Sequence, residues 1–207
     1  MAFRLAEDSR VRLPVLVSQE GFYLSFTREP VAVPDAASVA RFLPPFDPMG
    51  IEFRASRPAS QAVAVLGGSA YSYFRYEMHL AAQAALPVYD EIARQFGDEF
   101  GRFYPQVDAY RSEDAEVVFF MTGAFSTNAR AAVDCLREAG ERVGLVRPRL
   151  YRPFPRERLR QLLAGKQAVA VVDQNLSLGK GGVLATELAS ALYGMSDAPL
   201  LAEFVGG

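Results

Sequence analysis

The second half of the sequence alternates short apolar runs with stretches of helical periodicity. The apolar runs cover residues 117–121, 143–146, 168–172 and 200–205, and the helical stretches between them cover residues 126–139, 155–163 and 183–193. An unbroken run such as VVFFM is typical of a parallel strand that is covered on both faces. Single helices between such strands favour right-handed crossovers. The pattern therefore predicts an α/β fold, a three-layer α-β-α arrangement with a mostly parallel sheet.

The first half of the chain has no such alternation. Residues 3–10 are typical of the end of a helix, and residues 14–18 (PVLVS) predict a short buried strand. Asp35 is a suitable N-cap for a short helix that ends at Phe42. Three prolines and a glycine in FLPPFDPMG are incompatible with a continuing helix or a central strand. Residues 43–61 therefore predict an extended linker.

A long helix is predicted after this linker. Apolar side chains recur at helical spacing over residues 72–98. Pro87 lacks the backbone N–H that a helix interior needs, so we expect the helix to kink there or to divide in two.

Composition excludes several classes of protein. The chain has 207 residues, is 50% hydrophobic and carries a net charge of −2, which excludes a disordered chain and gives no electrostatic case for nucleic acid or an anionic membrane. Its one cysteine, Cys135, allows no internal disulfide and cannot by itself hold an iron–sulfur cluster or structural zinc. Its one histidine, His79, excludes a two-histidine metal site. The absence of a membrane-length apolar run and of a signal-peptide pattern predicts a cytoplasmic protein.

Ligands of a parallel sheet bind at the carboxyl ends of the strands, next to helix N-termini, and the first such loop here is TGAFST. Gly123 permits a sharp turn, and Ser126 or Thr127 can cap the helix that follows. The free N–H groups there could bind an anion. The alternative, which the sequence favours, is an ordinary strand–turn–helix junction.

A second loop, DQNLSLGKGG, precedes the last helix. Gly179, Gly181 and Gly182 give it the look of a phosphate cradle. A Walker motif, however, needs a hydroxyl residue where Gly181 follows Lys180, and the G-x-G-x-x-G spacing is also absent. A close-packed turn is the favoured interpretation, and anion binding stays the alternative.

Several stretches in one order resemble a known family. They are FRLAEDSRVRLPVLVSQEGFYLSF, FLPPFDP, YFRYEMH, YRSEDAEVVFFMTGA, VGLVRPRLYRPFP and VAVVDQNLSLGKGGVLATEL. Together they are similar to the C-terminal half of the α subunit of 2-oxoacid:ferredoxin oxidoreductases, of the pyruvate:ferredoxin oxidoreductase (pyruvate synthase) type. The resemblance covers essentially all 207 residues.

The resemblance also implies a domain organisation. Residues 1–18 resemble the last helix and strand of a pyrimidine-binding domain, residues 19–61 form an extended linker, and residues 62–207 resemble the C-terminal domain of transketolase. Against the longer family pattern, the chain looks truncated at both ends or naturally split. One departure concerns the loop QEGFYLSFT, where Phe26 stands at the position of a family histidine.

The resemblance implies the chemistry of the assembled enzyme. Thiamine diphosphate, bound with Mg²⁺, attacks the carbonyl of a 2-oxo acid and carbon dioxide leaves. Electrons then pass through [4Fe–4S] clusters to ferredoxin, and coenzyme A takes up the acyl group. The cofactor supplies the electron sink. The Gly-Asp-Gly motif of the diphosphate site and the cluster cysteines are absent from this sequence. Those cofactors are therefore expected in partner chains or in regions outside this sequence.

Two function hypotheses follow. In the first, the chain is a non-catalytic, inter-subunit part of a 2-oxoacid (pyruvate):ferredoxin oxidoreductase, whose partners are the thiamine-diphosphate-binding and iron–sulfur subunits. The apolar linker residues Leu43, Phe46, Met49 and Phe53 favour it, because a solvated connector does not need them. In the second, a stand-alone α/β domain binds an anion such as coenzyme A through its glycine loops. An α/β hydrolase is disfavoured, because no G-x-S-x-G elbow is present.

Overall fold

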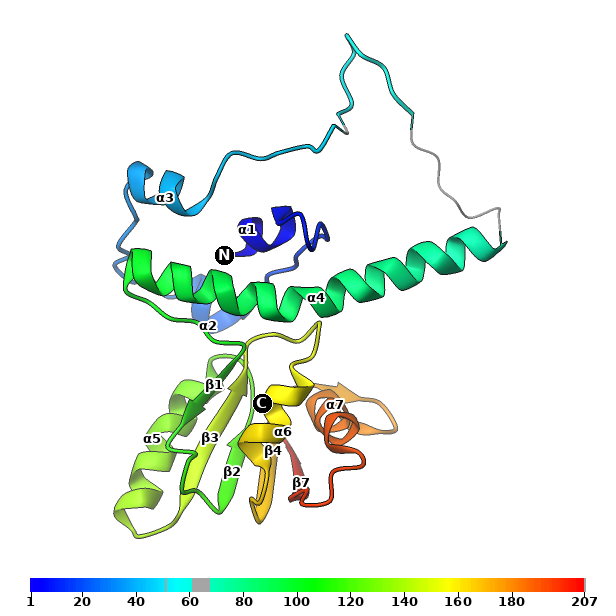
Figure 1. Cartoon of the computed structure of the whole chain (residues 1–207). Coiled ribbons are helices and arrows are strands. Elements are labelled where there is room, and N and C mark those ends of the chain that lie inside the picture. Colours follow the sequence, from blue (N-terminus) through cyan, green and yellow to red (C-terminus); the bar gives the residue numbers. More distant parts are fainter. Residues whose placement is uncertain (51, 61–67, 207) are drawn as a thin grey trace. The chain divides into compact units, whose positions relative to one another are not determined.

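The computed structural model describes residues 1–50, 52–60 and 68–206. Contacts group the chain into two compact units. The first comprises residues 1–17 and 31–103, and the second comprises residues 18–30 and 104–207. Helices and strands are labelled in Figure 1. Each unit has its own apolar core.

The second unit is built on a five-stranded sheet of order β1-β3-β2-β4-β7. The strands are β1 (Val107–Tyr110), β2 (Val117–Phe120), β3 (Val143–Pro148), β4 (Ala168–Asp173) and β7 (Leu200–Val205). Strands β3, β2, β4 and β7 are parallel neighbours, and β1 pairs with β3 in the antiparallel direction. The mostly parallel sheet predicted from the alternating pattern is confirmed.

Three helices cover the two faces of this sheet (Figure 1). They are α5 (Phe125–Glu138), α6 (Arg156–Leu163) and α7 (Val183–Leu192). Val118 and Phe120 of β2 are fully buried in one core cluster with leucines of α6 and α7. Val117 and Phe119, which point to the opposite face, belong to the cluster of α5. Burial on both faces explains the continuous apolar run and gives the three-layer α-β-α arrangement.

Arg137 ties the C-terminal end of α5 to the sheet. Its guanidinium donates to the backbone carbonyls of Val143 and Arg111 and makes two bonds of 2.7 Å to the Asp114 carboxylate. These bonds hold the pKa of Asp114 at about 2, well below its usual value. The pair therefore stays charged through the neutral and mildly acidic range.

The first unit is helical. It contains α1 (Ala2–Glu7), α3 (Ala36–Phe42) and α4 (Gly68–Phe100). The predicted cap is confirmed, because the Asp35 carboxylate accepts a 2.9 Å bond from the Ser38 amide. Helices α1 and α3 pack on the second half of α4, where Ala85, Val88 and Ile92 are buried. The helix runs through Pro87 without dividing in two.

Some local predictions were wrong. Residues 14–18 form no strand, and Leu16 is 97% exposed. The short helix α2 (Gly21–Phe26) lies within residues 19–61, for which no helix was predicted before Asp35. Strand β1 was also missed, because its four residues alternate too briefly to be recognised in the sequence. Strand β1 pairs with β3, and α2 contacts α5 through the Tyr23 and Phe125 rings, so both depend on contacts distant in the sequence.

The two compact units are defined by contacts within the structure, whereas the predicted domain ranges were defined by resemblance to a family. The predicted ranges 1–18, 19–61 and 62–207 stay a prediction about the domains of the family. In the structure, α4 packs with α1 and α3, and residues 18–30 belong to the unit of the sheet. Among the helices of the described residues, none has the length and apolar character needed to span a bilayer.

Gly144 of β3 offers a test of the packing around the sheet. A Cβ at this position would lie 2.6 Å from the Arg111 carbonyl oxygen and 2.9 Å from the Ser112 Cα, both of them backbone atoms. We expect Gly144→Ala to lower the free energy of unfolding by about 2 kcal/mol, in the range of overpacked cores. Urea denaturation measures this change.

Gly68→Ala is the matched control, because a Cβ there meets nothing within 4 Å and alanine favours the helix that begins at this residue. Equal stability of the two variants would contradict the packing described for β3.

Candidate functional site

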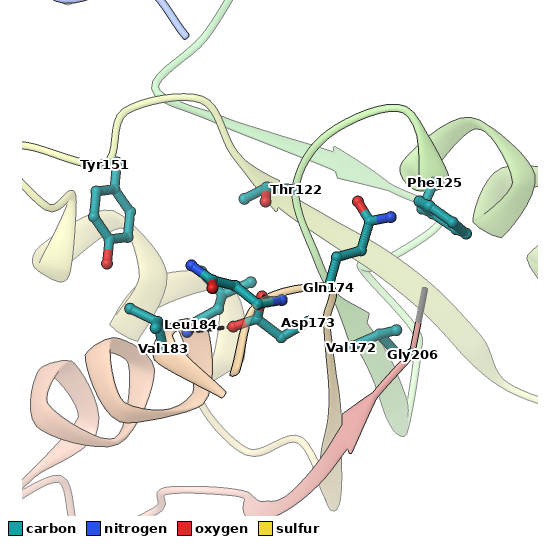
Figure 2. A pocket seen from close by; sticks show the side chains of 10 residues that line it. Thr122, Phe125, Tyr151, Val172, Asp173, Gln174, Val183, Leu184 and Gly206 are labelled. Carbon is teal, nitrogen blue, oxygen red and sulfur yellow. Dashed lines mark hydrogen bonds between the residues drawn. The ribbon is translucent and has the colours of Figure 1, made fainter. Parts of the chain in front are cut away.

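The carboxyl ends of β2, β4 and β7 surround a cavity of about 550 Å³. Parallel strands end at one edge of the sheet, which is where ligands of such folds bind. Figure 2 shows the lining side chains, which come from the first loop (Thr122, Phe125), from the second loop (Asp173, Gln174) and from Tyr151. The fold therefore brings the two loops selected from the sequence to one place. The cavity is the candidate functional site.

In the first loop, a carboxylate of the chain occupies the N-terminus of α5. Glu20, which precedes α2, accepts a 2.9 Å hydrogen bond from the Ala124 amide. Gly123 adopts φ +73°, which favours glycine, and its position lies close to the same carboxylate. The contact between the Tyr23 and Phe125 rings, with centroids 6.3 Å apart, holds α2 against the same helix end.

The hydroxyl residues of this loop have structural surroundings. Ser126 is buried, donates a 2.6 Å bond to the Gly123 carbonyl, and accepts a 2.9 Å bond from Arg147. Its hydroxyl is thus engaged as donor and as acceptor. Thr127 is exposed, and its amide bonds to the Ala124 carbonyl. Neither side chain accepts a hydrogen bond from the amides at the start of α5. The Glu20 carboxylate accepts one there instead, from the Ala124 amide.

The second loop forms a small hairpin of two-residue strands, β5 (Leu176–Ser177) and β6 (Gly181–Gly182). Gly179 adopts φ +80° in its turn. Lys180, the residue that suggested a phosphate cradle, is exposed, and its amide bonds to the Ser177 carbonyl. This loop is a turn, as the favoured interpretation of the sequence expected.

Two carboxylates approach the backbone where α7 begins. Asp173 accepts a 2.9 Å bond from the Asn175 amide and a 2.7 Å bond from the Leu184 amide. Glu203 of β7 accepts a bond from the Gly182 amide. A Cβ on Gly181 would lie 2.5 Å from the Glu203 carboxylate. Gly181 also adopts φ +112°, a backbone conformation that favours glycine whatever the space beside it.

In both loops, carboxylates of the chain lie at the N-terminus of the helix that follows. Helix N-termini attract anions because their N–H groups lack intrahelical partners and the helix dipole is positive there. Here Glu20, Asp173 and Glu203 supply the negative charge. A phosphate would have to displace a carboxylate, and the geometry therefore does not favour anion binding through Gly123, Ser126, Thr127, Gly179, Gly181 or Gly182. Their role in ligand binding stays a prediction.

Sequence reasoning missed Glu20 and Glu203, since each reaches its amide from a distant part of the chain. Asp173 had a local signal, because it directly follows an apolar strand and lies eleven residues before its partner amide. A carboxylate at such a strand end is well placed to cap the next helix.

The residues of the described chain do not fit the cofactors that the family resemblance implies. No group of three or more histidine, cysteine, aspartate or glutamate side chains in the described ranges is placed to hold a metal ion. Cys135 is exposed on α5, and a [4Fe–4S] cluster requires about four cysteines. Three amides at the starts of α5 and α7, those of Ala124, Gly182 and Leu184, are bonded to carboxylates of the chain.

Residues 115–207 match the family described as pyruvate:ferredoxin oxidoreductase core domain II. Pyruvate synthase subunit PorA of Pyrococcus abyssi is 34% identical over 207 residues, 100% of this chain and 52% of PorA. Over its whole length, this chain is therefore similar to subunits of 2-oxoacid:ferredoxin oxidoreductases. Ketoisovalerate oxidoreductase subunit VorA of the same organism is 35% identical over 209 residues, with 100% of this chain and 52% of VorA covered.

A solved 2-oxoglutarate:ferredoxin oxidoreductase from Magnetococcus marinus is 17% identical, with a TM-score of 0.44, over 68% of this chain and 21% of that chain. The chain spans about half the length of the curated relatives that it matches.

The contact between Glu20 and α5 predicts a measurable change in local protection. Glu20→Ala removes the acceptor of the Ala124 amide, so we expect that amide to exchange with solvent about fivefold faster, as for the loss of roughly 1 kcal/mol at a helix N-terminus. Hydrogen exchange followed by mass spectrometry or NMR measures it. Glu29→Ala is the control within the same segment, and equal exchange in both variants would contradict the capping role.

The two bonds of Asp173 predict an effect on stability. Asp173→Ala removes acceptors from the amides of Asn175 and Leu184, so we expect the free energy of unfolding to fall by about 1–2 kcal/mol. Thermal and urea denaturation measure this loss. Asp197→Ala, at an exposed turn, should stay within about 0.5 kcal/mol of the parent chain. A loss as large at position 197 would show that the effect is not specific to the cap.

Proposed function

We propose that this chain is an inter-subunit, non-catalytic part of a thiamine-diphosphate-dependent 2-oxoacid:ferredoxin oxidoreductase, equivalent to the C-terminal half of its α subunit. The complete enzyme converts a 2-oxo acid, with pyruvate the first candidate, and coenzyme A to acyl-CoA, carbon dioxide and reduced ferredoxin. Thiamine diphosphate, Mg²⁺ and [4Fe–4S] clusters belong to partner chains or to regions outside this sequence. The thiamine diphosphate would supply the electron sink for decarboxylation.

The observation that carries the proposal is the similarity to PorA over all 207 residues. Both the helical first unit and the sheet of the second unit lie within the matched length. A similarity confined to residues 115–207 would concern only part of the second unit. The full-length match extends it to α4 and to the linker before it.

The surface of α4 supports an inter-subunit role. Its first thirteen residues are all exposed, and they include six large apolar or aromatic side chains, which are Tyr71, Tyr73, Phe74, Tyr76, Met78 and Leu80. On a helix, Tyr71, Phe74 and Met78 share one face, and the others lie on the opposite side. A helix that is apolar on opposite faces is normally buried between other elements. Partner subunits of the oxidoreductase would cover it.

The alternative, a stand-alone domain that binds coenzyme A through its glycine loops, receives no comparable support. In each loop, carboxylates of the chain already accept hydrogen bonds from amides near the helix start, namely those of Ala124, Gly182 and Leu184. Repulsion between those carboxylates and a phosphate opposes binding.

The proposal is tested with an affinity tag on this chain in its source cells, followed by measurement of native mass, iron and thiamine diphosphate. We expect co-purifying subunits with both cofactors, and ferredoxin reduction that depends on a 2-oxo acid and coenzyme A. Pyruvate and the branched ketoisovalerate are compared as substrates, because identities to PorA and VorA are similar. A chain of 22.7 kDa purified alone, without iron or thiamine diphosphate, would overturn the proposal.

A paired variant locates the interface. Phe74→Ser with Tyr76→Ser should reduce co-purification at least tenfold, because aromatic side chains dominate interface energies. Leu178→Ser is the control, since Leu178 is 91% exposed on the hairpin turn. Circular dichroism of each variant establishes that the chain is folded.

A further inference from the structure

The cavity at the carboxyl edge of the sheet has a lining without positive charge. Among the described residues that border it, none is a lysine or an arginine (Figure 2). Asp173 contributes a carboxylate to the lining. Arg152, whose guanidinium lies over the Tyr151 ring, is paired with Glu187 at 2.6 Å. This charge distribution disfavours an anionic ligand, because a carboxylate faces the cavity and no cation of the lining offsets it.

The uncharged polar groups of the lining are two carboxamides and one hydroxyl. Gln174 and Asn175 follow β4 directly, and Thr122 lies just beyond β2. Strands β2 and β4 are parallel neighbours, so these three side chains emerge at the same edge of the sheet. Within the described part of the chain, their side chains take part in no hydrogen bond. Each carboxamide therefore offers a donor and an acceptor to a ligand.

Asp173 fixes the backbone that carries the two carboxamides. Its Oδ1 accepts a 2.9 Å bond from the Asn175 amide, and its Oδ2 accepts a 2.7 Å bond from the Leu184 amide. The second bond attaches the end of β4 to the start of α7. The segment thus has a defined position before a ligand arrives, which lowers the entropy lost on binding.

The rest of the lining is apolar and partly aromatic. Phe125 is half-buried, and its ring meets the Tyr23 ring edge-on. Val172, Val183 and Leu184 supply aliphatic surface. A cavity of about 550 Å³ with an apolar lining and a few convergent polar groups has the character of a small-molecule site. Aromatic and aliphatic surfaces of this kind pack well against a flat ring.

We propose that this cavity binds an uncharged planar heterocycle whose edge carries a hydrogen-bond donor next to an acceptor, which is the chemistry of a nucleobase. Carboxamides of asparagine and glutamine recognise such an edge, as they do with adenine, through a paired donor and acceptor. Gln174 and Asn175 would pair with the edge of the ring, and Phe125 would pack against its apolar surface. The proposal does not depend on the proposed function, because the lining belongs to this chain alone.

Adenine and uracil are the probes, titrated separately into the ¹⁵N-labelled 207-residue chain and followed by amide shifts and by saturation-transfer NMR. We expect saturable shifts at Thr122, Gln174 and Asn175 with at least one base. Binding of adenine alone would assign an amidine edge, and binding of uracil alone would assign a lactam edge. Saturable binding of both would assign the donor–acceptor pair that they share. No saturable binding of either base would overturn the proposal.

Benzoate is the comparison ligand, since it is a flat ring of similar size that carries a negative charge and no donor. We expect it to bind at least tenfold more weakly than the better base, because it cannot use the paired donor and acceptor and is repelled by Asp173. Equal binding of benzoate would mean that the cavity accepts any flat ring, and the proposed selectivity would be wrong.

A matched pair of variants makes the test specific. Gln174→Met keeps the length of the side chain but removes its donor and acceptor, so the better base should bind about tenfold more weakly. Gln167→Met is the control, because Gln167 is exposed as well and precedes β4 at the opposite end of the strand. Circular dichroism establishes that both variants are folded. Equal affinities of the two variants would overturn the role of Gln174.

Ionic strength gives a second, independent readout. The ligand is uncharged, so an increase in ionic strength of about tenfold should change the dissociation constant by no more than about twofold. A steep loss of affinity with added salt would mean that attraction between charges dominates, and that result would also overturn the proposal.

Discussion

Burial of β2 and β4 on both faces is the constraint on which the second unit depends. Val118 and Val169 are fully buried on the face of α6 and α7, while Val117 and Val172 pack toward α5. A strand buried on both sides cannot place polar side chains along its length. Polar side chains that follow such strands therefore collect at the carboxyl edge of the sheet, and this is where the cavity, the hairpin and the helix N-termini lie.

At that edge, the chain supplies its own anions. The positive ends of α5 and α7 would normally be the most attractive positions for a phosphate. Glu20 comes from a segment before the first unit's α3, and Glu203 comes from the last strand, so each carboxylate also ties a distant part of the sequence to a helix end. Gly181 is favoured as glycine by its φ of +112°, and the Glu203 carboxylate lies directly beside it. Loops with the composition of a phosphate cradle thus have a structural explanation.

The sequence predicted those elements that depend on local residue type and on periodic spacing. The runs that became β2 and β4, the amphipathic helix α5 and the Asp35 cap of α3 follow from spacing and residue type alone. It could not predict β1, whose four residues acquire a strand conformation by pairing with β3. Nor could it indicate that Asp108 would face Arg130 and Arg147, which are 22 and 39 residues away in the chain. Contacts of this kind depend on topology, because the sheet order is different from the order of strands in the sequence.

The two units differ in how completely their own residues bury their apolar side chains. The sheet buries large side chains such as Phe120 and Leu188 completely. The spacing that places Ala85, Val88 and Ile92 on the buried stripe of α4 also continues backward to Met78, Phe74 and Tyr71, which are exposed. Since α1 and α3 cover only the second half of this stripe, the first half has the pattern of a packed helix without its cover. Hydrophobic association would bury the same residues in a larger assembly, and the helix therefore connects the fold of this chain to its proposed place among partner subunits.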